Sequence, residues 1–135
     1  MKNLFLILSL FFIICFTASC DTDKASIMFN HDPITKETVM NNSTVFNRGE
    51  RIYYLILTPK TVRSRYIYIQ VIKKDNDYGQ FGYKLYWANT FRLKDEQMYY
   101  YDDYVVINEK GSYIMKVYSK DDPQRALTQA QFFVR

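Results

Sequence analysis

Residues 109–119 read EKGSYIMKVYS, and from Gly111 onward they alternate in the manner of a β-strand, with successive side chains on opposite faces. One face would carry Tyr113, Met115 and Val117, and the other Ile114, Lys116 and Tyr118. The lysine indicates that the second face meets solvent. We therefore expect the first face to lie in a hydrophobic core.

Two further segments, residues 65–73 and 126–134, show the same alternation. The residues expected in the core are Ile67, Ile69, Val71, Ala126, Thr128, Ala130, Phe132 and Val134. Those expected to face outward are Tyr66, Tyr68, Gln70, Leu127, Gln129, Gln131 and Phe133. If these strands are neighbours of 111–119, their outward residues form one continuous surface.

Short runs of β-branched and aromatic residues, separated by turn residues, continue along most of the chain and predict strands. The expected strands are residues 26–30, 38–46, 50–58, 65–73, 81–88, 98–107, 111–119 and 126–134. No long segment keeps the apolar spacing of a helix. The length of 135 residues favours one domain, over residues 26–135, and strands spaced about ten residues apart favour a β-sandwich.

The segment that contains Glu109, Gly111 and Tyr113 resembles the tyrosine corner of immunoglobulin-like sandwiches. In that motif the tyrosine opens the penultimate strand and its hydroxyl bonds back to the main chain. Met115 takes the place of the second cysteine of antibody domains. The resemblance implies an all-β, immunoglobulin-like antiparallel sandwich of about seven to eight strands without a disulfide.

The first twenty residues, MKNLFLILSLFFIICFTASC, have the layout of a secretory signal peptide. Lys2 gives a positive start, and an apolar run from Leu4 to Phe16 follows. That run of about 13 residues is shorter than the roughly 20 that a membrane-spanning helix needs. We therefore expect residues 1–19 to be removed on export.

The end of this segment, Thr17-Ala18-Ser19-Cys20, resembles the lipobox of bacterial lipoproteins. The resemblance implies that Cys20 is acylated and that residues 20–25 form a tether to the membrane. It places the protein in the bacterial cell envelope, facing the periplasm or the exterior. The alternative is a secreted protein that is cleaved without lipidation.

The sequence offers little for catalysis, so we expect no enzyme activity, cofactor or metal site. The single histidine, His31, stands in a turn-like stretch and is expected to be solvated or to cap a turn. Asp102 and Asp103 are consecutive on a strand, so their carboxylates should diverge. Residues 75–79, DNDYG, lack the later ligands of a calcium loop and predict a hairpin turn.

Five basic residues lie around the strand 65–73: Lys60, Arg63, Arg65, Lys73 and Lys74. The net charge of +4 is compatible with nucleic-acid binding, but an exported protein would rarely meet nucleic acid. Contact with anionic lipid or an acidic envelope polymer fits export better. The other interpretation is a solvated rim with no partner.

Tyrosine is the most distinctive residue, with 13 in the chain. On the predicted outer face it gathers with other residues into a possible binding surface formed by Tyr66, Tyr68, Tyr118, Phe133 and Lys116. Aromatic and polar side chains of this kind are typical of recognition surfaces, although strand propensity alone could also place tyrosines there.

These observations favour a non-enzymatic, membrane-anchored lipoprotein that binds a protein or glycan partner or supports an assembly. The alternative function is protease inhibition through loops at one end of the sandwich, an architecture similar to small bacterial inhibitors of the chagasin type. The loops that could serve are residues 59–65, 88–97 and 119–125.

Overall fold

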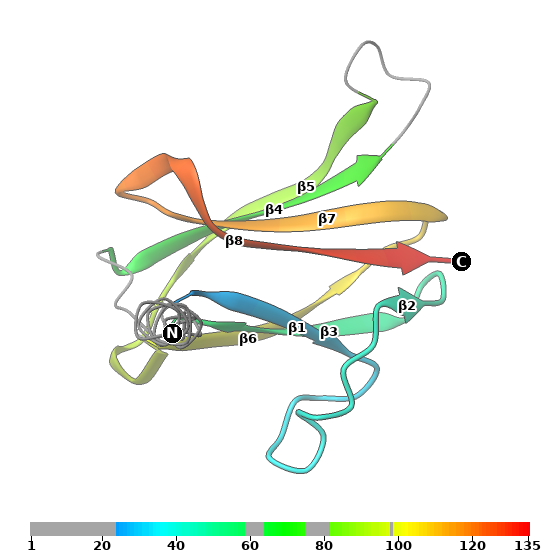
Figure 1. Cartoon of the computed structure of the whole chain (residues 1–135), viewed down its shortest axis with the longest axis horizontal. Helices are drawn as coiled ribbons and strands as arrows, with labels where there is room; N and C mark the ends of the chain where they lie inside the picture. The colour runs from blue at the N-terminus through cyan, green and yellow to red at the C-terminus, as the bar shows by residue number, and fades with distance from the viewer. Residues whose placement is uncertain (1–23, 59–63, 75–81, 98) are drawn as a thin grey trace, which may run out of the picture.

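The computed structural model describes residues 24–58, 64–74, 82–97 and 99–135, which form two β-sheets packed face to face (Figure 1). One sheet has three strands, β1 (Ser26–Asn30), β3 (Arg51–Leu57) and β6 (Tyr100–Val106). The other has five strands, β2 (Val45–Phe46), β8 (Asp122–Val134), β7 (Gly111–Ser119), β4 (Tyr66–Lys74) and β5 (Tyr83–Arg92). The predicted all-β sandwich is confirmed.

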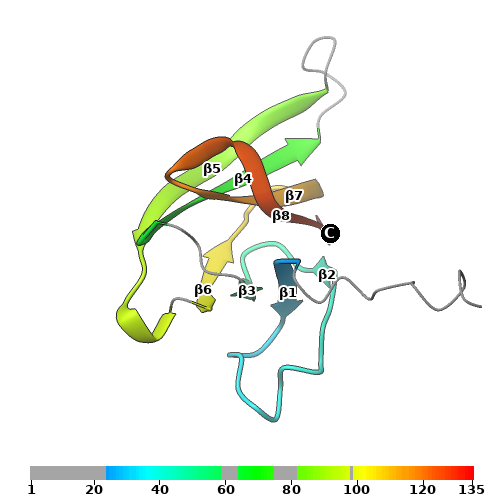
Figure 2. The same ribbon diagram turned by 60° about the vertical axis from the view of Figure 1, so that its left-hand side comes forward.

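The strand order matches the immunoglobulin-like arrangement. Within the five-stranded sheet the order is β2-β8-β7-β4-β5, so the strands predicted to be neighbours are hydrogen-bonded to one another. The three-stranded sheet, β1-β3-β6, forms the opposite layer (Figure 2). All pairs are antiparallel except the short β2, which runs parallel to the end of β8.

The core lies between the sheets and uses the faces that the alternation predicts. On β4, Ile67, Ile69 and Val71 are at most 1% exposed, while Tyr66 on the outer face is 38% exposed. Tyr113, Met115 and Val117 of β7 are fully buried. Phe132 and Val134 of β8 are also buried, whereas the earlier inward positions of that strand are half-buried, so the hydrophobic core ends before the β7–β8 turn.

The tyrosine corner is present at the start of β7. The Tyr113 hydroxyl donates a hydrogen bond of 2.7 Å to the main-chain oxygen of Glu109, and its ring stacks on Phe132. Gly111, which lies between Glu109 and Tyr113 in the sequence, has a φ of 152°, a backbone conformation that residues with a Cβ rarely adopt. A Cβ at this position would lie 2.9 Å from Cε of Lys73, so glycine also makes room for that lysine to reach Glu109.

The predicted strand over residues 38–46 is wrong for most of its length, because only Val45 and Phe46 are in a strand. The preceding residues fold into turns in which polar side chains bond to the main chain. Thr38 donates to the carbonyl of Pro33 at 2.7 Å, and Asn42 accepts the N–H of Phe29 at 3.0 Å. Bonds from side chains to the main chain compete with a β-ladder, and the apolar residues here are too few to offset them.

Two further boundaries differ from the prediction. Strand β5 extends to Arg92 rather than ending at residue 88, because it pairs with β4 along its full length. Strand β8 begins at Asp122 rather than 126, and Pro123 is accommodated next to its first residue. Between β5 and β6, residues 95–97 form a 3-10 turn, η1 (Asp95–Gln97). No helix among the described residues could span a bilayer.

Because the inward face of β4 is buried and its outward face is solvated, truncations on the two faces should differ in cost. We expect Ile69→Ala to lower the free energy of unfolding by about 2–5 kcal/mol, since it removes a buried side chain and leaves a cavity. Tyr66→Ala, on the same strand, should change it much less. Urea denaturation of both variants checks this, and a larger loss for Tyr66→Ala would show that the register is wrong.

Two buried tyrosines allow a sharper comparison. Tyr54 and Tyr113 are both fully buried, but the Tyr54 hydroxyl has no hydrogen-bond partner among the described residues. Tyr113→Phe should therefore destabilise the domain by about 1 kcal/mol, because it removes a hydrogen bond. Tyr54→Phe should be neutral or stabilising, because it removes a buried hydroxyl that makes no hydrogen bond. Equal destabilisation by the two substitutions, measured by thermal and urea unfolding, would contradict this assignment.

Candidate functional site

The outer face of the five-stranded sheet brings three of the predicted surface tyrosines together. Tyr68 and Tyr118 are directly opposite each other on β4 and β7, with ring centroids 6.2 Å apart. Tyr66 lies two residues along β4, and its ring is 4.8 Å from the Lys120 ammonium. The Tyr68 hydroxyl also accepts a bond from Gln70. We call Tyr66, Tyr68 and Tyr118 the tyrosine cluster.

Phe133 shares this face but lies far from the tyrosine cluster. It is opposite Ser112, six residues along β7 from Tyr118, which corresponds to about 20 Å of strand. Lys116 lies between the two, opposite Gln70 and Gln129. The five residues predicted to form one binding surface thus lie at different places along the sheet.

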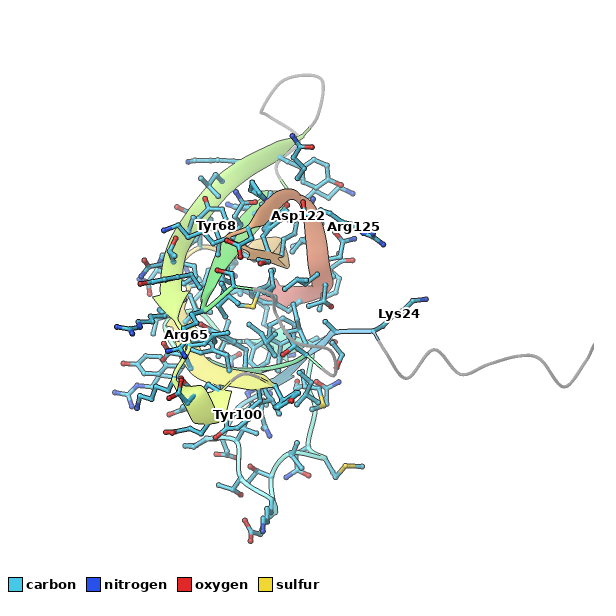
Figure 3. The ribbon with its side chains drawn as sticks, turned by 90° about the vertical axis from the view of Figure 1, so that its left-hand side faces the viewer. Lys24, Arg65, Tyr68, Tyr100, Asp122 and Arg125 are labelled. Carbon is cyan, nitrogen blue, oxygen red and sulfur yellow. The ribbon has the colours of Figure 1, made fainter. Side chains whose placement is uncertain are left out.

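The described basic residues around β4 lie at its two ends. Arg65, just before β4, is 3.3 Å from the carboxylate of Asp95, at the same end of the sandwich as Lys24 and Tyr100 (Figure 3). Lys73 and Lys74 lie at the other end, where the Lys73 ammonium is 2.9 Å from Glu109. The remaining predicted members, Lys60 and Arg63, lie outside the described residues.

Other predicted positions have mixed outcomes. Cys20, the hairpin over 75–79 and most of the loop 59–65 lie outside the described residues. Of the other two end loops, residues 88–92 belong to β5, and residues 119–125 are a tight hairpin whose turn is Lys120-Asp121.

The two consecutive aspartates diverge as expected. Asp102 is exposed, while Asp103 is half-buried and accepts bonds from the Tyr101 hydroxyl and the Tyr104 N–H. Burial, the nearby charge of Asp103 and this bond raise the pKa of Tyr101 well above its ordinary value. These contacts assign Asp103 a structural role.

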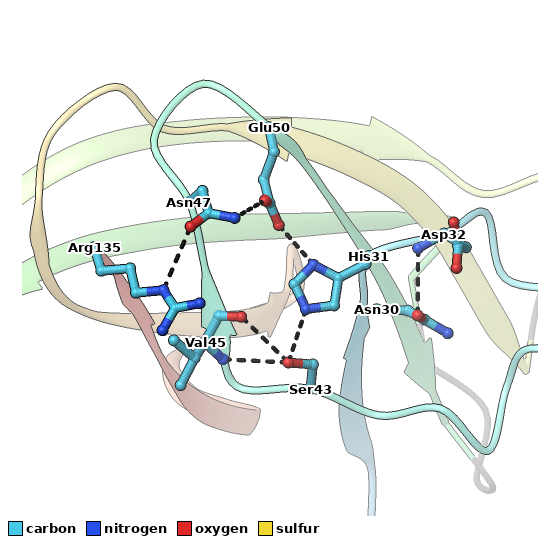
Figure 4. A network of polar contacts seen from close by, with 8 residues as sticks. All are labelled: Asn30, His31, Asp32, Ser43, Val45, Asn47, Glu50 and Arg135. Atoms are coloured by element: carbon cyan, nitrogen blue, oxygen red, sulfur yellow. Dashed lines mark hydrogen bonds and ion pairs between the residues drawn. The ribbon is translucent and has the colours of Figure 1, made fainter.

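At the opposite end from Lys24, His31 is the centre of a polar network that sequence reasoning missed (Figure 4). Its Nδ1 is 2.7 Å from Oε1 of Glu50, and its Nε2 is 3.1 Å from Oγ of Ser43. Its ring also lies 4.7 Å from that of Phe46. The three polar residues come from three separate turns, so only the fold brings them together.

A hydroxyl, an imidazole and a carboxylate in this order are the groups that activate serine in many hydrolases. Here the main-chain N–H groups beside the hydroxyl are already engaged. The Ser43 N–H donates to Phe29, and the Val45 N–H lies 3.4 Å from the Ser43 Oγ. The serine is thus part of a turn, and we interpret the network as a set of structural hydrogen bonds that join the β1–β2 segment to the start of β3.

Asn47 connects this network to the end of β8. Its Nδ2 donates to Oε2 of Glu50 at 2.9 Å, and its Oδ1 accepts a 3.4 Å bond from Nε of Arg135. Burial alone would raise the pKa of Glu50, but bonds from Asn47 and His31 outweigh it and leave the pKa below its ordinary value. The Glu50 carboxylate is therefore charged and hydrogen-bonded to both His31 and Asn47.

Beyond Asn47 lies an open polar pocket of about 410 Å³, lined by Asn47, Arg48, Gly49, Asn108 and Arg135. Main-chain bonds hold its walls, since the Arg48 N–H donates to Arg135 and the Gly49 N–H donates to Ile107. Gly49 has a φ of 78°, which the tight turn before β3 requires. None of the five lining residues is acidic, and the described residues contain no group of three side chains suited to a metal ion.

No protein-family model matches the sequence, and no curated protein resembles it. Solved structures with a similar shape include an alkylpurine DNA glycosylase from Pseudomonas fluorescens, bound to DNA with an abasic site analog (16% identity, TM-score 0.39). The match covers 81% of this chain but only 30% of the glycosylase chain.

Two other solved structures are similar at the same level. A CARDB domain from Pyrococcus furiosus, in complex with di-metal ions, is 14% identical with a TM-score of 0.38, over 82% of this chain and 88% of that one. A β-glucosidase from Listeria innocua, in complex with gluconolactone, is 9% identical with a TM-score of 0.43, over 84% of this chain and 16% of that one. At these values the similarities carry no information about activity or ligands.

The lowered pKa of Glu50 predicts a pH-dependent contribution to stability. A carboxyl whose pKa is lower in the folded than in the unfolded state stabilises the fold above its unfolded pKa, and this stabilisation is lost as the pH falls through the folded pKa. We expect Glu50→Gln to be less stable than the parent at pH 7, with the difference shrinking toward pH 3.

Urea denaturation at a series of pH values checks this expectation. Glu96→Gln, which removes an exposed acid of η1, serves as the control. A difference between parent and Glu50→Gln that stays constant from pH 7 to pH 3 would show that the Glu50 charge contributes nothing.

Proposed function

We propose that the protein is an exported lipoprotein, held in the bacterial cell envelope by acyl chains on Cys20, with its β-sandwich acting as a non-catalytic binding module. The observation that carries the proposal is the sequence Thr17-Ala18-Ser19-Cys20, which follows an apolar run and lies six residues before β1. The buried core residues of the sandwich lie between Phe29 and Val134.

The tether would fix how the domain is presented. Residues 21–25 span at most about 18 Å when fully extended. Ser26 pairs with Leu57 at one end of the three-stranded sheet, so this end would stay close to the bilayer surface. Strands β1 and β8 both end at the opposite end of the sandwich (Figure 1). That end, with the His31 network and the polar pocket, would point away from the membrane. Acylation at a single cysteine with several chains is enough for stable anchoring.

A binding role is supported by the side chains that the sandwich leaves outside its core. The tyrosine cluster combines rings with hydroxyl, amide and ammonium groups at one surface, as recognition surfaces do. The partner would be a protein or a glycan of the envelope.

The anchor can be tested with a matched pair of cysteine variants. In a bacterial host fed with radiolabelled palmitate, the parent and Cys15→Ser should both be labelled and found in the membrane fraction. Cys20→Ser should lose the label, because Cys20 is the only cysteine at the lipobox position. An unlabelled parent that is free in the medium would overturn the proposal, as would labelling that depends on Cys15.

A further inference from the structure

The strongest unassigned feature is the polar pocket at the end of the sandwich opposite Ser26. It combines two guanidinium groups, Arg48 and Arg135, with the amide side chains of Asn47 and Asn108. All four are hydrogen-bond donors, and guanidinium is the group best suited to bind carboxylate or phosphate with two parallel bonds.

Both arginines retain unused donors. Within the part of the chain that the structure describes, the Arg48 guanidinium has no hydrogen-bond or ion-pair partner. Arg135 uses only its Nε, in the long bond to Asn47. The two guanidinium groups repel each other across the pocket, and a bound anion would relieve that repulsion.

The two acids that are adjacent in sequence to the pocket residues already have partners. Glu50 is bonded to His31 and Asn47, and Glu109 pairs with Lys73. The described basic residues at this end, Arg48, Lys73, Lys74, Lys84, Lys110 and Arg135, outnumber the acids Asp32, Glu50 and Glu109. The other end differs, since Arg65 is paired with Asp95 and Arg125 has Asp122 nearby on the same strand (Figure 3).

The pocket is also preorganised. Asn47 is held by Glu50 on one side and holds Arg135 on the other, so the His31 network positions one of the two guanidinium groups (Figure 4). Two main-chain hydrogen bonds join the turn before β3 to the ends of β8 and β6. The Arg48 N–H donates to the Arg135 oxygen, and the Gly49 N–H donates to the Ile107 oxygen. Fixed donors reduce the entropy lost when a ligand binds.

We propose that this pocket binds an anionic group, a phosphate or a carboxylate, carried by the envelope partner of the domain. The proposal deepens the proposed binding function and rests on it for the identity of the partner, but the binding chemistry is independent of Cys20. Arg48 and Arg135 clamp the anion, while Asn47 positions Arg135.

The test uses an unlipidated chain that begins at Asp21, since every core residue lies between Phe29 and Val134. Amide NMR spectra are recorded during titration with sodium phosphate and, separately, sodium glucuronate, with chloride keeping the ionic strength constant. The amides of Gly49 and Asn108 should shift in a saturable way with at least one of the two anions. Stronger binding of phosphate indicates a phosphoryl ligand, and stronger binding of glucuronate an acidic sugar.

Arg48→Gln and Arg135→Gln should each weaken the apparent affinity at least 5-fold, while Arg92→Gln, the same change at the far end, should leave it unaltered. The spectrum of each variant shows whether it is folded, and Asn47→Ala provides a second perturbation that should also weaken binding. Absence of saturable shifts with both anions would overturn the proposal. Equal weakening by Arg92→Gln would do the same, because it would show non-specific charge screening.

The two proposals fail separately. A pocket that binds anions in a chain whose Cys20 is never acylated would leave this inference intact and remove the anchor. A lipidated protein whose pocket binds neither anion would leave the anchor and remove this site.

Discussion

The two sheets are joined by an aromatic cluster on which the rest of the sandwich depends. Phe29 of the three-stranded sheet packs against Phe132 and Phe46 of the five-stranded sheet, with ring centroids 4.9 and 6.4 Å apart. Tyr113 also stacks on Phe132, with ring centroids 5.5 Å apart. All four side chains are at most 2% exposed, so their burial provides a large share of the hydrophobic stabilisation.

This cluster also explains why the polar groups gather where they do. His31 follows β1, the strand that carries Phe29. Its ring packs against Phe46, so the His31 network lies directly on the end of the hydrophobic core. Asn47 follows Phe46 directly, and Arg135 follows Val134, the last buried residue of β8. The pocket is thus formed by the residues that come directly after the buried parts of two strands.

The two ends of the sandwich differ in how their charged groups are paired. At the end near Ser26, Arg65 and Asp95 pair with each other. At the other end, Glu109 pairs with Lys73 and Glu50 is bonded to His31, while the Arg48 guanidinium has no partner among the described residues. If the protein is anchored through Cys20, this second end is the one presented to the envelope.

The sequence by itself determined the strands with strong alternation, the inward faces of β4 and β7, and the tyrosine corner, because these depend on the two-residue period of a strand and on neighbours within a few residues. It could not show that residues 38–44 form turns, since the bond from the Phe29 N–H to Asn42 joins residues 13 apart in the sequence. The site was decided by the tertiary structure alone. His31, Ser43, Glu50 and Arg135 carry no local signal, and only the parallel pairing of β2 with β8 and the packing of β1 beneath them bring those groups within hydrogen-bonding distance.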